Sequence, residues 1–244
     1  MKIIKKKSVI LLTGCAGFIG SNLTNYLVKN KKFVVGLDNF KLGNIKNLSD
    51  VINDKNFIFK KIDISKFFLL EKYIKKLSKK FKIETIWHLA ANSDIKDGFK
   101  DPDNDYKNTF LTTYNLIKIS KKYKVKNFIF ASSSAIYGDL RNQKLSEESG
   151  PLLPISTYGA MKLASEGIIS AAKESFLKKI YIFRFPNVVG RPSTHGVIHD
   201  FILRLKKNPK TLKVLGNGKQ KKVRPYKTNI FHYTRKIQRF FYKK

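Results

Sequence analysis

The chain has 244 residues, 42% of them hydrophobic and 13% aromatic, so it can bury a core for one domain, or for one domain and part of another. Its 50 Lys and Arg residues against 17 Asp and Glu give a net charge of +33, which raises nucleic acid as a partner. Because 43 of the basic residues are Lys, only 7 are Arg and all are spread along the chain, specific nucleic-acid binding is disfavoured.

The first predicted element is a buried strand, Ser8–Thr13. A lipidated secretory leader is the alternative, because the basic stretch Met1–Lys7 precedes the strand and Leu12–Cys15 resembles the box before a lipidated cysteine. The apolar run is shorter than the about 7–15 residues of a secretory segment, so the strand is favoured. No run approaches the about 18 apolar residues of a transmembrane helix. A single cysteine suits a reducing compartment, so we expect a cytoplasmic protein with no membrane partner.

Short apolar strands alternate with amphipathic helices over the first 190 residues. The predicted strands are Ser8–Thr13, Phe33–Leu37, Phe57–Lys61, Thr85–Leu89, Phe128–Ser132 and Ile180–Phe185. The predicted helices lie near residues 18–30, 66–80, 102–123 and 157–177, and Asp101-Pro102 is a typical start for the third. This alternation predicts an α/β fold with a doubly wound parallel sheet, the Rossmann arrangement, over residues 1–190.

The pattern weakens after Arg191. A helix near Val197–Lys207 and a short strand, Thr211–Leu215, lead into a glycine turn, and we assign residues 191–220 to an incomplete second lobe. Residues 221–244 hold nine Lys or Arg and no Asp or Glu. We predict a solvated basic tail there, although the spacing of its apolar residues would also suit an amphipathic helix.

A glycine-rich turn, Gly14-x-x-Gly17-x-x-Gly20, follows the first predicted strand and opens the first helix. Glycines at these positions let a pyrophosphate approach the backbone N–H groups of the helix start. Eighteen residues beyond Gly20, Asp38 ends the second strand, where a carboxylate can accept from both ribose hydroxyls and would repel a 2′-phosphate. The turn and the acid together predict NAD rather than NADP as the cofactor. Asp63 and Ile64, after the third strand, are further candidates for contacts with the adenine.

Two Tyr-x-x-x-Lys pairs, Tyr158–Lys162 and Tyr114–Lys118, each place a phenol and an ammonium one helical turn apart. A cation beside a phenol lowers its pKa and makes it usable as a base. About two such pairs are expected by chance in a chain so rich in Lys, so context must separate them. Tyr158 follows a hydroxyl cluster, Ser132–Ser134, at a strand end, whereas Tyr114 lies in the middle of a helix. We therefore predict that Tyr158 is the catalytic one.

Four segments together carry a family resemblance. They are Thr13-Gly-Cys-Ala-Gly-Phe-Ile-Gly20, His88-Leu-Ala-Ala91, Ser132-Ser-Ser-Ala-Ile-Tyr-Gly138 and Tyr158-Gly-Ala-Met-Lys162. In this order and spacing they resemble the extended short-chain dehydrogenase/reductase family, and most of all its UDP-glucose 4-epimerases, over roughly residues 8–220. The resemblance implies that Ser133 is the active-site hydroxyl, Tyr158 the base and Lys162 the lysine that binds the cofactor ribose.

The resemblance also implies a set of binding residues and partners. The cofactor contacts that it implies are Gly14, Gly17, Phe18, Ile19, Gly20, Asp38, Asn39, Asp63, Ile64, Leu89, Ala90, Ala91, Asn108 and Lys162. The contacts that it implies for a nucleotide-diphosphate sugar are Ser93, Ser133 and Asn187. A homodimer through the helices near 102–123 and 157–177 would fit the family. His195 and His199 have no evident third ligand, so we expect no metal site.

One position divides the family by its chemistry. The 4,6-dehydratases carry an acid directly after the active-site hydroxyl, where it eliminates water from the sugar. The corresponding residues are Ser134 and Ala135, neither of which can act as a general acid. The sequence therefore favours an epimerase, in which Tyr158 takes the proton of the 4-hydroxyl, a hydride passes to NAD⁺, and the 4-keto sugar turns before the hydride returns.

The resemblance ends after Gln220, and the continuation that family members show is not recognisable in residues 221–244. A frameshift or truncation would explain this loss, and so would divergence. In either case we expect the change to affect substrate binding, and with it activity, more than cofactor binding. Two rival hypotheses are an inactive dinucleotide-binding remnant and a basic protein that binds nucleic acid or a membrane surface.

Overall fold

The computed structural model describes residues 6–93, 95–139, 145–192, 197–212 and 214. The chain divides into two compact units, residues 1–184 and 185–244. The second unit has one helix among its described residues, α7 (Val197–Lys207), at the predicted position. The predicted boundaries of 1–190, 191–220 and 221–244 stay predictions, and the whole of the predicted tail lies outside the described residues.

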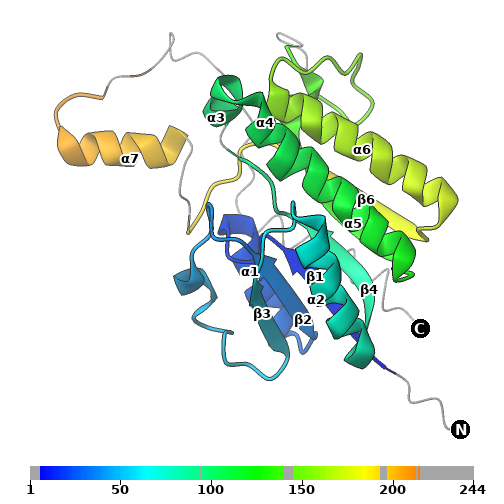
Figure 1. Ribbon diagram of the computed structural model, residues 1–244. Helices are drawn as coiled ribbons and strands as arrows, with labels where there is room; N and C mark the ends of the chain where they lie inside the picture. Colours follow the sequence, from blue (N-terminus) through cyan, green and yellow to red (C-terminus); the bar gives the residue numbers. More distant parts are fainter. Residues whose placement is uncertain (1–5, 94, 140–144, 193–196, 213, 215–244) are drawn as a thin grey trace, which may run out of the picture. The chain divides into compact units, whose positions relative to one another are not determined.

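A six-stranded sheet forms the centre of the first unit (Figure 1). Its strands are β1 (Lys7–Thr13), β2 (Val34–Asp38), β3 (Phe57–Lys61), β4 (Phe81–His88), β5 (Asn127–Ser133) and β6 (Lys179–Phe185). Their order is β3-β2-β1-β4-β5-β6, and the pairings β1–β2, β1–β4, β2–β3 and β4–β5 are parallel. The predicted doubly wound fold is therefore confirmed. The strand order reverses between β1 and β4, so ligands are expected at the carboxyl ends of these strands.

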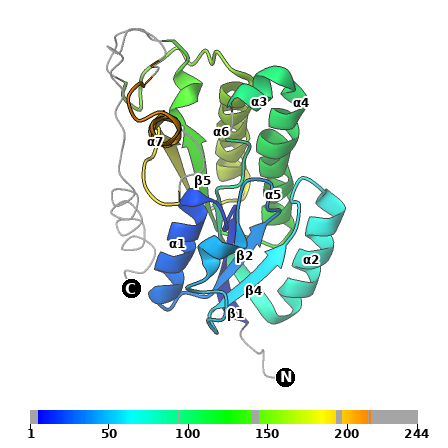
Figure 2. The same cartoon turned by 90° about the vertical axis from the view of Figure 1, so that its left-hand side faces the viewer.

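Helices cover both faces of the sheet. Helix α1 (Phe18–Lys29) lies on one face, and α2 (Phe67–Lys80), α5 (Leu111–Lys122) and α6 (Thr157–Ser175) lie on the other (Figure 2). Leu70, Ile74 and Leu77 of α2 are buried, and their spacing of four and three residues gives that helix one apolar face. The short elements are η1 (Ile45–Leu48), α3 (Ile95–Lys100), α4 (Pro102–Asp105), the π-helical segment η2 (Tyr106–Phe110) and η3 (Ser134–Tyr137).

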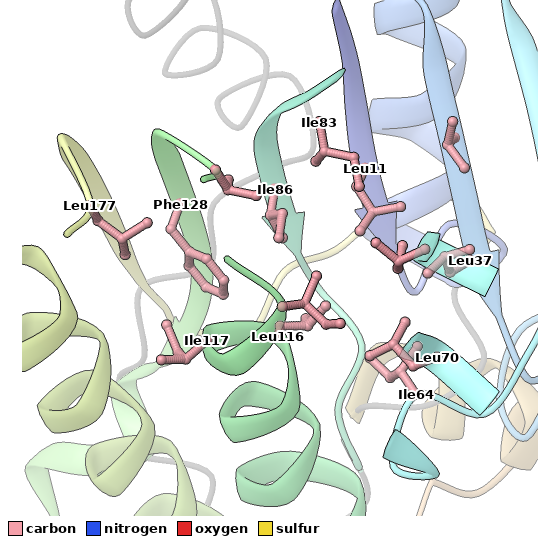
Figure 3. Close-up of a cluster of buried hydrophobic side chains, with 14 of the residues drawn as sticks. Leu11, Leu37, Ile64, Leu70, Ile83, Ile86, Leu116, Ile117, Phe128 and Leu177 are labelled. Atoms are coloured by element: carbon pink, nitrogen blue, oxygen red, sulfur yellow. The ribbon is translucent and has the colours of Figure 1, made fainter. Parts of the chain in front are cut away.

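The main core lies between the sheet and the helices α2, α5 and α6. Leu11, Ile86 and Phe128 from the strands pack with Leu70 and Leu116 from the helices (Figure 3). Each of these side chains is fully buried, and burying one such side chain contributes about 1.5–3 kcal/mol. This core fixes the strand ends at which the candidate site residues lie.

Three predicted elements differ from the structure. The predicted helix over residues 102–123 is interrupted by the π-helical segment η2, because Asn108 and its neighbours wind with a wider turn than the 3.6-residue pattern assumes. Strand β4 begins at Phe81 rather than Thr85, since Lys82 and Glu84 break the apolar run although this stretch pairs with Lys7–Val9. The strand predicted over 211–215 is wrong at its described residues 211, 212 and 214, where no strand forms. An apolar run cannot show whether a backbone partner is available.

Candidate active site

The glycine turn between β1 and α1 has the backbone geometry that its residues predict. Gly14 has a φ of +70°, and a Cβ there would lie 2.8 Å from the Ala90 nitrogen. A Cβ on Gly20 would lie 1.9 Å from the Gly14 carbonyl oxygen. Gly17 is the N-cap of α1 and supplies no capping side chain, so the N–H groups of Phe18 and Ile19 open the helix without one. Bare N–H groups at a helix start are a binding site for phosphate.

Asp38 ends β2 and is buried beside this turn. Its Oδ2 accepts a hydrogen bond from the Ala16 N–H at 2.9 Å, and its Oδ1 accepts one from the Phe40 N–H at 2.8 Å. Each carboxylate oxygen has a second lone pair, so these bonds orient the group and still allow it to accept from ribose hydroxyls. Asn39 folds back locally, and its Oδ1 accepts from the Lys41 N–H at 2.9 Å. The turn and the acid thus fit a dinucleotide without a 2′-phosphate.

The candidates for adenine contacts, Asp63 and Ile64, follow β3. Oδ1 of Asp63 accepts from the Ser65 N–H at 2.9 Å, which forms a local turn. The Ile64 side chain belongs to the hydrophobic core, and its carbonyl accepts from Nδ2 of Asn115 at 3.0 Å. The side chain of Ile64 is therefore used by the fold, and a contact with adenine would have to come from its main chain.

A chain of buried hydrogen bonds joins the end of β1 to the end of β4. Nδ1 of His88 lies 2.8 Å from Oγ1 of Thr13, and its Nε2 lies 3.0 Å from Oγ1 of Thr113. The Ala90 N–H donates to Oγ1 of Thr13 at 3.3 Å, which places the predicted cofactor segment Leu89–Ala91 beside the glycine turn. Burial, with the nearby Lys162 charge second, holds the pKa of His88 well below its usual value, so the imidazole is neutral.

Asn108 and Ser93, predicted to contact cofactor and substrate respectively, lie on either side of a further buried cluster. Asn108 is in the π-helical segment, and its Nδ2 donates to Oδ1 of Asn104 at 2.7 Å. Beside Ser93, the Nδ2 of Asn92 donates to Oδ1 of Asp105 at 2.7 Å. Asp105 is fully buried, and its Oδ2 has no hydrogen-bond partner among the described residues. Burial raises the pKa of this carboxyl, and the hydrogen bond from Asn92 opposes the change.

The predicted catalytic residues come together at the end of β5 and the start of α6. Ser156 caps α6 through its hydroxyl, which accepts from the Gly159 N–H at 3.1 Å, so Tyr158 lies in the first turn. A hydrogen bond joins Tyr158 to Ser133, the last residue of β5. One turn later, the buried ammonium of Lys162 donates to the Ala131 carbonyl at 2.5 Å. A half-buried hydroxyl, a half-buried phenol and a buried ammonium thus meet in one cluster.

The expected lowering of the Tyr158 pKa is wrong for this structure. Burial raises the pKa of the phenol to about 12, and the hydrogen bond with Ser133 only partly opposes this. Lys162 lies 5.8 Å from the centre of the phenol ring, and burial lowers its own pKa to about 7, against the raising influence of Glu166. An ammonium that is itself desolvated is charged only part of the time near neutral pH, so it lowers the pKa of the phenol less than a permanently charged group at the same position would.

The second Tyr-x-x-x-Lys pair has different surroundings. Tyr114 is 41% exposed on α5, where its ring stacks on Phe110. The Lys118 ammonium lies 3.4 Å above the ring of Phe67 and 5.5 Å from the ring of Tyr114. Tyr114, at an exposed position, and Lys118 thus take part in ring contacts, whereas Lys162 is buried.

Two residues that act on the site were missed by reasoning from the sequence. Asp105 acts on Tyr158 and raises its pKa, and Glu166 acts on Lys162. Glu166 could have been found, because it lies one helical turn after Lys162 on the same face of α6. Asp105 could not, because its approach to Tyr158 depends on the packing of α4 and the π-helical segment against α6.

The remaining predicted positions give little information about the site. Asn187 is a described residue of the second unit, and His195 lies outside the described residues. Within the described part of the chain no three His, Cys, Asp or Glu side chains group in a way that could hold a metal ion. Cys15 is fully buried, and burial raises the pKa of its thiol, as expected of a small loop residue. None of the described helices is both long enough and apolar enough to cross a membrane.

A Rossmann sheet that combines a bare glycine turn with a serine, a tyrosine and a lysine is the arrangement of the short-chain dehydrogenase/reductase class, and the protein is of this class. A family model described as the NAD dependent epimerase/dehydratase family matches residues 10–225. The chain therefore belongs to that family.

The relatives include proteins named as dehydratases and proteins named as epimerases. A dTDP-D-glucose 4,6-dehydratase of Dictyostelium discoideum is 34% identical, over 86% of this chain and 50% of the relative. A putative UDP-glucose 4-epimerase of Methanocaldococcus jannaschii is 32% identical, over 87% and 67%. A solved UDP-glucuronic acid 4-epimerase of Bacillus cereus, in complex with UDP-glucuronic acid and NAD, has a TM-score of 0.80 and 28% identity, and the match covers 96% of this chain and 74% of that one. The chain thus spans about half to two thirds of the length of these curated relatives.

Proposed function

We propose that this protein is an NAD-dependent 4-epimerase of a nucleotide-diphosphate sugar. The observation that carries the proposal is the cluster of Ser133, Tyr158 and Lys162. Directly after Ser133 the sequence has Ser134 and Ala135, where a dehydratase needs an acid. A dehydratase is the second candidate, because the relative from Dictyostelium has that activity by name. Without an acid after Ser133, elimination of water has no proton donor at this position.

The glycine turn, Asp38 and Lys162 are the groups that would hold NAD. The bare N–H groups at the start of α1 suit the pyrophosphate, and the Asp38 carboxylate suits unphosphorylated ribose hydroxyls. Lys162 would donate to the ribose next to the nicotinamide ring. Bound NAD⁺ supplies an acceptor for the hydride of the sugar and later its donor.

The protein's own residues would handle the proton and orient the sugar. Tyr158 would take the proton of the 4-hydroxyl and return it after the keto sugar has turned. The single hydroxyl proton of Ser133 would be donated to the Tyr158 phenolate before the sugar binds, which stabilises the phenolate, and to the sugar oxygen once the sugar is bound. Lys162 would favour the phenolate electrostatically whenever it is charged. Ser93 and Asn187 are the proposed contacts of the nucleotide sugar.

The proposed function is tested by the product. The full chain with NAD⁺ is incubated with UDP-glucose and, separately, with dTDP-glucose, and the product sugar is followed by NMR. Inversion at C4 without loss of water is the expected result. Formation of a 4-keto-6-deoxy sugar would show that the protein is a dehydratase and not an epimerase. NAD binding with no change in either sugar would support the hypothesis of an inactive remnant.

We also propose a homodimer through α5 and α6, which pack together in the first unit. Tyr106, Phe110 and Tyr114 form an aromatic row with centroid separations of 6.2 and 6.4 Å, and Tyr106 and Tyr114 are each more than 40% exposed. Light scattering of the purified chain measures the mass directly. A monomer at all concentrations tested would overturn this part of the proposal.

A further inference from the structure

A buried ion pair adjoins the catalytic cluster and has no role in the proposed reaction. The side chain of Glu166 is 8% exposed and that of Arg184 is 23% exposed. The guanidinium binds the carboxylate at three points, through Nε at 3.2 Å to both oxygens and through Nη2 at 2.9 Å. Nη1 of Arg184 also donates to the Tyr137 hydroxyl at 3.1 Å and to the Glu147 carbonyl at 2.8 Å. A buried pair is no more stabilising than apolar residues of similar volume, so a role beyond stability has to be sought.

Glu166 and Lys162 hold two successive residues at the end of β5. Lys162 donates to the carbonyl of Ala131, and the hydroxyl of Ser132 donates to Oε1 of Glu166. Side chains one turn apart on α6 thus bind adjacent positions of the strand. The next residue is Ser133, whose hydrogen bond with Tyr158 belongs to the catalytic cluster. The placement of Ser133 relative to Tyr158 therefore depends on two anchors from the helix that carries Tyr158 itself.

Glu166 is also the negative charge that acts on Lys162. The other titratable groups around the ammonium are Tyr158 on α6 and His88 on β4, and His88 is neutral. Asp105, from α4, acts on Tyr158, and Arg184, from β6, forms the ion pair with Glu166. Burial lowers the pKa of Lys162 to about 7, and Glu166 is the group that opposes this. The charged fraction of Lys162 at neutral pH therefore depends on Glu166.

We propose that Glu166, oriented by Arg184, is a positioning residue of the active site, which fixes Ser133 beside Tyr158 and keeps Lys162 charged. The catalytic meaning of this inference rests on the proposed function, since that function gives Ser133, Tyr158 and Lys162 their roles. The contacts and the effect on Lys162 can be tested without any substrate.

The test uses the full chain labelled with ¹³C at the lysine Cε position and titrated by NMR without ligands. Ordinary lysines stay charged up to about pH 10, so a lysine that titrates near pH 7 is resolved from the rest. Its absence in Lys162→Arg assigns it. In Glu166→Gln the titration midpoint of Lys162 should fall by about one pH unit, because the negative charge that favours the ammonium is removed. Glu174→Gln is the matched control, since Glu174 is an 83% exposed acid on the same helix. In this variant the titration midpoint of Lys162 should not move.

A purely structural role gives a different result. Loosening of the site would admit water and raise the midpoint towards 10.5, whereas loss of the charge lowers it. An unchanged or raised midpoint in folded Glu166→Gln overturns the proposal, and a midpoint close to that of the unchanged protein in Glu166→Asp supports it. If Glu166→Gln does not fold, Glu166→Asp takes its place: the negative charge is kept, so the titration midpoint of Lys162 should stay close to that of the unchanged protein, and a midpoint raised towards about 10.5 overturns the proposal.

Turnover gives the second measurement. If the protein epimerises a UDP-sugar, Glu166→Gln should lower kcat about tenfold at pH 7 and leave KM within about twofold, as expected when the charge of Lys162 is reduced. An unchanged kcat overturns the catalytic part of the inference. If the unchanged protein does not turn over, the proposed function fails, and the NMR titration alone decides whether Glu166 controls Lys162.

Discussion

The two halves of the carboxyl edge of the sheet are built in different ways. At β1 and β2, the candidate cofactor site consists of backbone: a glycine turn, the start of α1, and one acid held by two N–H groups. At β5 and β6, the candidate catalytic site depends on side chains that meet across the chain, such as Lys162 with Ala131 and Glu166 with Arg184. The first half tolerates only small residues, whereas the second half tolerates only particular charges. Substitutions in the first half should therefore act mainly through steric clashes, and those in the second half mainly through lost or changed charges.

The largest expected effect is in the side-chain half. Tyr158→Phe removes the proposed base, and the rate of hydride transfer from the sugar should fall by about 10²- to 10⁴-fold. Tyr114→Phe, the matched control in the exposed pair, should leave the rate within about twofold, because that phenol lies outside the cluster. Both rates are measured in single turnovers with NAD⁺ and a UDP-sugar. Comparable losses in the two variants would show that their surroundings do not separate them.

The second prediction concerns the cost of a buried lysine. The pKa of Lys162 is lowered to about 7 in the folded protein and is about 10.5 when unfolded. Between these values the unfolded chain binds more protons, so this group makes stability rise with pH from 7 to 10.5 and destabilises most below pH 7. Lys162→Met should raise the stability at pH 6 by a few kcal/mol and flatten this pH dependence. Denaturant unfolding of both proteins from pH 6 to 9 measures this difference, and a variant less stable than the unchanged protein at pH 6 would show that burial of the ammonium does not destabilise the fold.

In the backbone half, the expected effect is steric. A methyl group on Gly20 would meet the Gly14 carbonyl, so Gly20→Ala should lose about 1–3 kcal/mol of stability and weaken NAD binding. Gly167→Ala is the control, because no atom lies within 4 Å of a Cβ built there. That change should stabilise α6 by about 0.5–1 kcal/mol and leave NAD binding unaltered. Thermal unfolding and calorimetric titration with NAD check both variants. Equal effects at the two glycines would show that the crowding at Gly20 does not matter for stability or for NAD binding.

The smallest expected effect is on cofactor choice. NAD should bind more tightly than NADP, and Asp38→Ala should reduce the preference about tenfold, because a like charge no longer faces the 2′-phosphate. Asp54→Ala provides a control, since Asp54 accepts only a local turn hydrogen bond from the Asn56 N–H. Equal affinities for NAD and NADP in the unchanged protein would show that Asp38 does not read the 2′-hydroxyl.

The same comparison explains what could be predicted from the sequence. The sheet and the glycine turn follow from local patterns, because apolar periodicity and backbone freedom are properties of neighbouring residues. The serine, tyrosine and lysine could be named because a family resemblance carried them. Arg184 and Asp105 could not, because their roles depend on the packing of β6 and α4 against α6. Glu166 was missed, although its position one helical turn after Lys162 could have revealed it. The π-helical segment at Asn108 was missed for a related reason, since an extra residue in one turn leaves no mark in the pattern.

The hydrogen bonds of His88 have a consequence for the order of folding. The Thr113 hydroxyl donates to the Thr109 carbonyl at 2.9 Å, so it accepts from Nε2 of His88, and Nδ1 accepts from the Thr13 hydroxyl. Thr13, directly before the glycine turn, is thus linked through His88 to Thr113, which lies 100 positions later in the chain. We expect the turn to acquire its final geometry only after α5 has docked, because long-range closure of this kind is slow. We therefore expect a nascent chain that ends before α5 to contain the whole glycine motif and still lack affinity for a dinucleotide.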